Sequence, residues 1–342
     1  MPLDSVSAIE QASAGASRDD VVRAASERGR IPDFFVVGQL KSGTTALYEM
    51  LKQHPRIHLP DRKEPRFFAE EMYHRDPPRP GGTPQTLSEY ISWFEDARAD
   101  QLIGDNSPSY LWSRTAAQRI AAVRPDARIV AIVREPASMV RSLHLELVQL
   151  YVETETDLRR AIDLEEPRRR GLHISRHTYW PKMLQYAEFT RYAEQLSRYR
   201  ERFAPEQMLV LVYDDFRADN AGTVRKVLRF LGVDESAPIV ATDANPSVRV
   251  RSQRVHELVH AVSVGHGPLS RAVKGSLKAV MPRRLRQSAL QATQQRLVFD
   301  RPPAPDEQLM LELRRSYKPE VVALSEWLGR DLVQEWGYDR LD

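Results

Sequence analysis

The sequence predicts a three-layer α/β fold, in which a central parallel sheet is flanked by helices and followed by helical additions at the C-terminus. Short apolar runs alternate along the chain with segments in which apolar residues recur at helical spacing. The runs are apolar at almost every position, which is typical of strands buried on both faces. Alternation of such strands with helices indicates a parallel sheet.

The first half of the predicted fold begins with a strand over 33–38, because a Phe-Phe-Val-Val run fills this segment. Apolar residues at helical spacing predict helices over 44–53 and 87–94. A further helix is expected over 113–123, with Ser113 as its N-terminal cap.

The second half continues with a strand over 128–133, where the sequence reads RIVAIV. The next helix is expected to open at Pro136, since proline is favoured in the first turn of a helix. A helix over 192–203, a strand over 208–213 and a helix over 221–231 follow, and a glycine marks the end of the last one.

The domain organisation expected from these patterns is simple. Residues 1–30 are small and polar and are expected to form an N-terminal extension. A single α/β domain of P-loop-like type is expected over 31–342. The strand signals end after Asn245, so 252–342 is expected to be mainly helical, with closing helices over 306–328.

The composition is that of an ordinary soluble globular protein, with 42% hydrophobic and 28% charged residues in a chain of 342. The sequence contains no cysteine, which excludes disulfides and thiolate metal sites and fits a reducing compartment. No apolar run is long enough to span a bilayer or to resemble a signal peptide. We therefore expect a cytoplasmic protein. Without a zinc-finger spacing or an aromatic-interleaved basic repeat, nucleic acid is a poor candidate partner.

Residues 38–45, GQLKSGTT, join the first predicted strand to the first predicted helix. The unpaired N–H groups and the dipole at a helix N-terminus favour an anion such as phosphate. Lys41 adds a positive charge, and Thr44 and Thr45 add hydroxyl donors. In a Walker A loop the lysine follows the second glycine, whereas here Lys41 precedes Gly43.

A second informative segment follows the strand over 128–133. Arg134 comes directly after this strand, which puts a guanidinium group at the carboxyl edge of the sheet. Ligands of open α/β sheets bind at that edge. Pro136 then opens the helix that carries Ser142.

Together the two segments resemble those of the sulfotransferases that use 3′-phosphoadenosine 5′-phosphosulfate (PAPS), and the chain is similar to bacterial members of that family. In this family the lysine-containing loop binds the 5′-phosphate of the donor. An Arg-x-Pro string and a serine at the spacing of Ser142 bind its 3′-phosphate. The resemblance covers about 32–252 and implies a metal-free transfer of a sulfuryl group to a hydroxyl or an amine. The donor-binding residues that it implies are Lys41, Ser42, Gly43, Thr44, Thr45, Arg134 and Ser142, with Arg249 and Arg251 as further candidates.

The KEPRFF segment, residues 63–68, resembles the glycan-type, Golgi-like branch, in which the glutamate is the general base. The resemblance implies that Glu64 removes a proton from the acceptor. It also implies that Lys41 neutralises charge on the bridging oxygen as the S–O bond breaks. The alternative for Glu64 is a local ion pair with Lys63 or Arg66.

The segment GDNSPSY, residues 104–110, resembles a family segment that lies beside the acceptor. Some glycan-sulfating members have a lysine at the position of Asn106, so this departure weakens a sugar acceptor of that subgroup. The acceptor class stays open among a lipid, a glycan, a peptide and a secondary metabolite. Lone histidines are more often structural than functional, but one is included among the acceptor-binding candidates, which are Asn106, Ser107, Tyr110 and His144.

Two other functions fit parts of the sequence. A P-loop kinase or NTPase also binds phosphate at a strand–loop–helix unit, but it needs the GK[ST] order and magnesium. A non-enzymatic binder of a polyanion or an anionic membrane surface would use the basic segment 271–296, although a solvated helix face is the commoner explanation for such a segment. A homodimer is expected only because two-fold homodimers are the commonest soluble oligomers, and no feature of the sequence points to one.

Overall fold

The structure is a computed structural model that describes residues 30–69, 71, 83–175, 178, 180–241, 249–250, 299–300, 302 and 304–341. Its contacts divide the chain into two compact units. We call the first the sheet unit, and it comprises Met1–Val140, Ala187–Asn245 and Glu312–Asp342. The second unit comprises Arg141–Tyr186 and Pro246–Leu311. A single domain over 31–342 stays a prediction.

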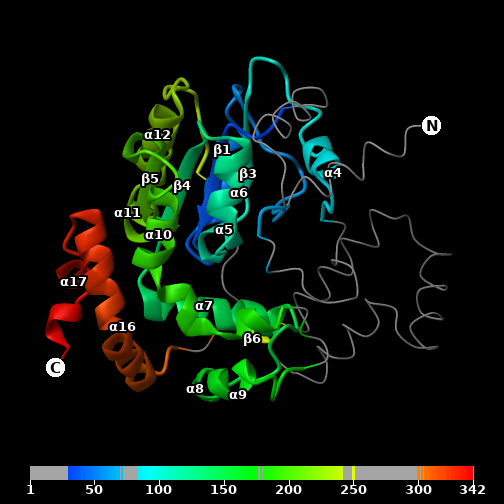
Figure 1. Ribbon diagram of the computed structural model, residues 1–342. Coiled ribbons are helices and arrows are strands. Elements are labelled where there is room, and N and C mark those ends of the chain that lie inside the picture. Colours follow the sequence, from blue (N-terminus) through cyan, green and yellow to red (C-terminus); the bar gives the residue numbers. More distant parts are fainter. Residues whose placement is uncertain are drawn as a thin grey trace, which may run out of the picture. The chain divides into compact units, whose positions relative to one another are not determined.

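The sheet unit is built on five parallel strands in the order β2-β3-β1-β4-β5 (Figure 1). In that spatial order the strands are Ile57–His58, Leu102–Asn106, Phe34–Gly38, Arg128–Val133 and Met208–Val212. The predicted parallel sheet is therefore confirmed. β1 lies in its centre between β3 and β4, so the loops that follow these three strands leave the sheet at the same edge.

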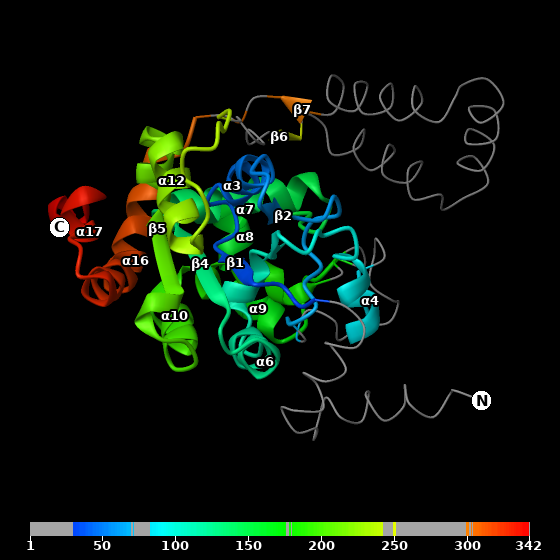
Figure 2. The same cartoon turned by 90° about the horizontal axis from the view of Figure 1, so that it is seen from above.

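Helices cover both faces of this sheet, and Figure 2 shows the strands between the two groups. On one face α12 (Asn220–Leu231) contacts α3 (Thr44–Leu51), α11 (Tyr213–Ala218) and β5. On the other face α5 (Ser109–Trp112), α6 (Ala116–Val123) and α10 (Tyr192–Arg200) contact one another, and α5 packs on β1.

The remaining elements of the sheet unit lie elsewhere in the chain. α4 spans Leu87–Ser92. α16 (Glu307–Leu328), α17 (Leu332–Glu335) and the 3₁₀ turn η5 (Tyr338–Arg340) close the chain.

The core explains why these segments form strands and helices. Side chains of β1 and β4, such as Phe34, Val130 and Ile132, are almost fully buried against the apolar faces of α3 and α12. Every residue of β1 is buried, as the continuous apolar run predicted. α12 ends at Gly232, whose φ of 67° lies in the left-handed region. The predicted ends of this helix are thus confirmed to within one residue.

Several elements differ from the prediction. β3 was not predicted because its sequence, LIGDN, ends in polar residues that satisfy their hydrogen bonds only in the fold. The helix expected over 113–123 begins at Ala116, since Ser113 Oγ accepts from Ala116 N at 3.0 Å and Ser109–Trp112 form a separate short helix. The expectation that strands end after residue 245 was wrong, because β6 (Arg249–Val250) and β7 (Phe299–Asp300) form an antiparallel pair.

The second unit carries most of α7 (Pro136–Gln149), which starts in the sheet unit, together with α8 (Leu158–Asp163) and α9 (Glu165–Arg169). The η2 turn (Pro181–Leu184) belongs to it as well. Among the described residues of both units, no helix is long and apolar enough to cross a membrane. The predicted extension, up to residue 29, and most of 252–304 lie outside the described residues.

Gly38 offers a direct test of the packing that ends β1. Its φ is 153°, and an added Cβ would lie 2.6 Å from Leu111 Cβ and 2.7 Å from Pro108 O. We expect Gly38→Ala to lower the free energy of unfolding by about 2–3 kcal/mol through overpacking. The control is Gly329→Ala, which has a positive φ but meets nothing within 4 Å and should cost only about 1 kcal/mol. Equal losses in urea unfolding would contradict the packing argument.

Candidate functional site

The loop after β1 has the geometry of an anion site. α3 begins at Thr44, and its N-terminal cap is Gly43, which has φ of 88° and no side chain to occupy the N–H groups of the first turn. Gly43 also packs closely, because an added Cβ would lie 3.1 Å from the rings of Phe216 and Tyr213. The first turn of α3 therefore presents backbone donors to a ligand.

Gln39 anchors the start of this loop from inside the protein. Its side chain is fully buried, and Nε2 donates to Phe189 O at 2.8 Å and to Gln195 Oε1 at 3.1 Å. Gln39 Oε1 in turn accepts from Leu40 N at 2.7 Å. The loop is thus tied to Phe189, which precedes α10, and to Gln195 within α10.

Arg134 joins the second predicted segment to the loop. Its Nη1 donates to Lys41 O at 2.8 Å, and its guanidinium lies 4.7 Å from the centre of the Tyr213 ring. β4 and β1 are paired neighbours, so the residue that follows β4 naturally reaches the loop that follows β1. The structure therefore brings Arg134 and Lys41 together, as their positions after neighbouring strands suggest.

Glu135, the neighbour of Arg134, is held by a set of contacts that sequence reasoning missed. Its buried carboxylate accepts from Ala137 N at 3.0 Å and Ser138 N at 2.7 Å, which caps the first turn of α7. Tyr338 of η5 donates to the same carboxylate, and burial followed by the charge of Glu135 raises the pKa of this tyrosine well above its usual value. Arg314 of α16 lies 3.8 Å from it. No local signal could have revealed contacts across about half of the chain.

The KEPRFF segment lies beside the same loop. Lys63 Nζ donates to Thr45 Oγ1 at 2.8 Å and lies 5.1 Å from the centre of the Tyr48 ring. Sequence reasoning had considered Lys63 only as an ion-pair partner of Glu64. The structure instead places its ammonium group at the start of α3, next to a hydroxyl that was expected to bind phosphate.

Glu64 is paired with Arg66, as in the alternative interpretation of this residue. Arg66 Nε donates to Glu64 Oε2 at 3.1 Å, and Nη2 donates to the same oxygen. Burial favours the neutral acid, but the charges of Arg66, Lys63 and Lys41 outweigh it and lower the pKa of Glu64. Glu64 is therefore an ionised carboxylate near the loop at neutral pH, and its role as a base stays a prediction.

A second carboxylate, Asp105 at the end of β3, has no access to solvent. It accepts hydrogen bonds from Ser107 Oγ at 2.7 Å, Tyr90 OH at 2.8 Å and Tyr110 OH at 2.9 Å. Burial is the main cause that raises the pKa of Asp105 to about 6, partly offset by these three hydrogen bonds and supported by the charge of Glu64. The sequence pattern contained this aspartate but gave no reason to single it out.

The next residue, Asn106, faces the start of α3. Its Nδ2 donates to Thr44 O at 3.2 Å, whereas its buried Oδ1 has no hydrogen-bond partner in the described part of the chain. A buried amide oxygen without a partner is costly. Contact between Asn106 and an acceptor stays a prediction.

Comparison with known proteins agrees with this geometry. Residues 32–237, more than half of the chain, match the model of the sulfotransferase family. The chain belongs to the sulfotransferase family. Mouse heparan sulfate glucosamine 3-O-sulfotransferase 3B1 is 26% identical over 208 residues, which cover 60% of this chain and 47% of the relative. Human bifunctional heparan sulfate N-deacetylase/N-sulfotransferase 3 is 28% identical over 222 residues, which cover 60% of this chain and 22% of that protein.

The chain thus spans about half or less of the length of these curated relatives. A solved sulfotransferase structure from Alicyclobacillus acidocaldarius covers 89% of this chain and 98% of its own, with a TM-score of 0.62 and 24% identity. This likeness shows that the two proteins share the fold. The family match includes the loop after β1, the KEPRFF segment and Arg134.

The remaining candidate residues of this sulfotransferase-family chain belong to the second unit. Ser142 lies on α7 and is buried. Arg249 lies in β6, where it is the register partner of Asp300, whereas Arg251 lies outside the described residues. Binding of the donor by these three residues stays a prediction.

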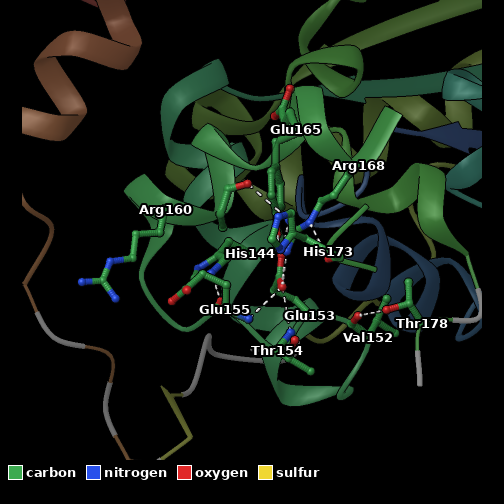
Figure 3. Close-up of polar contacts among 12 residues, drawn as sticks. His144, Val152, Glu153, Thr154, Glu155, Arg160, Glu165, Arg168, His173 and Thr178 are labelled. Carbon is green, nitrogen blue, oxygen red and sulfur yellow. Dashed lines mark hydrogen bonds and ion pairs between the residues drawn. The ribbon is translucent and has the colours of Figure 1, made fainter. Parts of the chain in front are cut away.

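His144 also lies in the second unit, and Figure 3 shows it among structural contacts. Its Nε2 is 2.8 Å from Glu155 O, and burial lowers the pKa of its imidazole. Beside it, a fully buried ion pair joins Arg168 Nη1 and Nη2 to the two carboxylate oxygens of Glu153, each at 2.7 Å (Figure 3). Contact between His144 and an acceptor stays a prediction.

The raised pKa of Asp105 predicts a pH dependence of stability. Between pH 3.8 and about 6 the folded protein holds a proton that the unfolded chain releases, so ionisation of Asp105 opposes folding as the pH rises. The free energy of unfolding of wild type, measured relative to that of Asp105→Asn, should fall by about 2 kcal/mol from pH 4 to pH 6.5. Urea unfolding at several pH values measures this difference. The exposed Asp96→Asn serves as control, and a pH-independent difference for Asp105→Asn would contradict the assignment.

Proposed function

We propose that this protein transfers a sulfuryl group from PAPS to a hydroxyl or amine of an acceptor. The observation that carries the proposal is the hydrogen bond from Arg134 to the carbonyl of Lys41, 2.8 Å long. It joins the guanidinium after β4 to the phosphate loop after β1. Two anionic groups of one nucleotide, a 5′-phosphosulfate and a 3′-phosphate, match two neighbouring cationic positions of this kind.

The residues of the loop fit the phosphosulfate end of the donor. The N–H groups at the start of α3 and the Lys41 ammonium group would hold the 5′-phosphosulfate, with the hydroxyls of Thr44 and Thr45. Lys63, which is hydrogen bonded to Thr45, adds a positive charge there. Arg134 would hold the 3′-phosphate. When bound, PAPS supplies an activated sulfuryl group.

The chain's own groups supply charge stabilisation and proton transfer. Lys41 would neutralise the negative charge that develops on the oxygen between phosphorus and sulfur as the S–O bond breaks. Glu64 would accept the proton of the attacking hydroxyl or amine, and its lowered pKa keeps it in the ionised form that a base requires. The products are the sulfated acceptor and 3′,5′-bisphosphoadenosine. Positioning of both substrates would supply much of the acceleration.

A P-loop kinase is less well supported. Lys41 precedes Gly43, so the loop lacks the GK[ST] order in which the hydroxyl after the lysine binds magnesium. The names of the curated relatives point to glycan acceptors for those proteins. Asn106 replaces the lysine of some glycan-sulfating members, so the proposal assigns the acceptor only to the class of hydroxyls and amines.

Calorimetric titration with 3′,5′-bisphosphoadenosine tests the donor. We expect binding that does not depend on magnesium, and at least a tenfold weaker affinity in Arg134→Ala, since one charged hydrogen-bonding group is worth about 1.5–3 kcal/mol. The exposed Arg225→Ala on α12 is the matched control. Preference for ATP with magnesium would support the kinase alternative and contradict the proposal.

Glu64→Gln tests the base. The substitution keeps the size of the side chain but removes the proton acceptor, so release of labelled sulfate from PAPS to water should fall at least a hundredfold. The affinity for 3′,5′-bisphosphoadenosine should change less than threefold, and the exposed Glu201→Gln should behave as wild type. If affinity falls together with rate, Glu64 serves the nucleotide site or the fold instead.

A further inference from the structure

The segment that carries Glu64 has an unusual backbone. Glu64 has φ of 58° and Arg66 has φ of 54°, so two residues with full side chains adopt the left-handed conformation within three positions. Each such residue costs of the order of 1 kcal/mol or more, and it persists only where the surroundings enforce it. Something outside the segment must therefore hold it.

Hydroxyl groups on and after β3 hold the backbone of this segment. Arg66 N donates to Ser107 Oγ at 3.1 Å, and Phe68 N donates to Tyr110 OH at 3.4 Å. Both hydroxyls then donate to the carboxylate of Asp105. Asp105 thus reaches two peptide groups of the segment through one intervening hydroxyl each.

Aromatic packing ties the same segment to the same carboxylate. Phe67 stacks on Tyr90 with ring centres 4.8 Å apart, and Phe68 packs edge-on against Tyr90 at 5.2 Å. Phe68 also lies 5.9 Å from Tyr110. Tyr90 and Tyr110 are the two tyrosines that donate to Asp105. One buried carboxylate therefore orients both rings against which the Phe-Phe pair rests.

Asp105 itself has no route to a substrate. Its side chain is 0% exposed, and Oδ1 and Oδ2 are occupied by the three hydroxyl donors. Ser107 and Tyr110 are 0% exposed as well, which argues against the direct acceptor contact that the sequence suggested for them. Replacing this carboxylate by an amide removes one of the two acceptor oxygens that the three buried hydroxyls share, which is costly.

We propose that Asp105, acting through Ser107 and Tyr110, is a positioning residue that holds the backbone of 64–68 in the conformation that aims Glu64 at the acceptor. The inference rests on the proposed function, because it assumes that Glu64 is the base. It assigns the buried hydroxyls of the GDNSPSY segment to the catalytic loop instead of to the acceptor.

Ser107→Ala is the mildest test, since it removes only the hydroxyl between Asp105 and Arg66 N. Amide hydrogen exchange within 64–68 should become about tenfold faster, the effect of losing one hydrogen bond of about 1.4 kcal/mol. Release of labelled sulfate from PAPS to water should fall at least tenfold, while the affinity for 3′,5′-bisphosphoadenosine changes less than threefold. Ser107→Thr, which keeps a hydroxyl, should restore both readouts at least in part.

A double-substitution cycle separates positioning from a general loss of stability. In the Glu64→Gln background there is no base to misplace, so Ser107→Ala should cause no further loss of rate. Tyr186→Phe, which removes a buried hydroxyl from the carboxylate of Glu153 in the second unit, is the matched control and should leave exchange within 64–68 unchanged.

Two results would overturn the inference alone: unchanged exchange and rate in Ser107→Ala, or an equal loss of rate with and without Glu64. Asp105→Asn should reproduce the faster exchange and the loss of rate of Ser107→Ala. A different result, in which the wild type neither binds 3′,5′-bisphosphoadenosine nor releases sulfate, would overturn the proposed function and this inference with it.

Discussion

The site depends on the parallel pairing of β1 with both β3 and β4. Because the three strands run in the same direction, their carboxyl ends meet at one edge of the sheet. The phosphate loop follows the central strand, Arg134 follows one neighbour, and Asp105 is the next-to-last residue of the other. Groups that are distant in sequence therefore converge without a dedicated binding domain. A change of strand order would separate them even if every loop kept its sequence.

Buried carboxylates then fix the loops at this edge. Glu135 on one side binds the first turn of α7 and Tyr338, next to Arg134. Asp105 on the other side binds three hydroxyls that contact the segment with Glu64. Burying a carboxylate is costly unless several donors satisfy it. Both carboxylates accept hydrogen bonds from three donors each, which offsets the cost of burying them beside the phosphate loop.

Features that depend on local sequence were predicted well. Continuous apolar runs predicted β1, β4 and β5, and the order of lysine and glycine in the loop indicated the sulfotransferase family. β3 and α5 were missed because LIGDN and SYLW carry weak or polar patterns over four or five residues. Their conformation is imposed by neighbours: β3 pairs with two strands, and α5 packs on β1.

Features that depend on tertiary contacts could not be predicted. The sequence offered Lys63 or Arg66 as the ion-pair partner of Glu64; Arg66 forms that pair, whereas the hydrogen bond from Lys63 to Thr45 was not predicted. The role of Asp105 is visible only once Tyr90 and Ser107 are placed around it. Tyr338 lies about two hundred positions after Glu135, so no spacing rule links them.

The central claim is that the loop between β1 and α3 binds the 5′-phosphosulfate of PAPS. A crystal structure of the protein with 3′,5′-bisphosphoadenosine tests it most directly. We expect the 5′-phosphate within hydrogen-bond distance of the backbone N–H groups of residues 42–45, with the Lys41 ammonium group beside it, and the 3′-phosphate on Arg134. A nucleotide bound elsewhere, or in the reverse orientation, would contradict it.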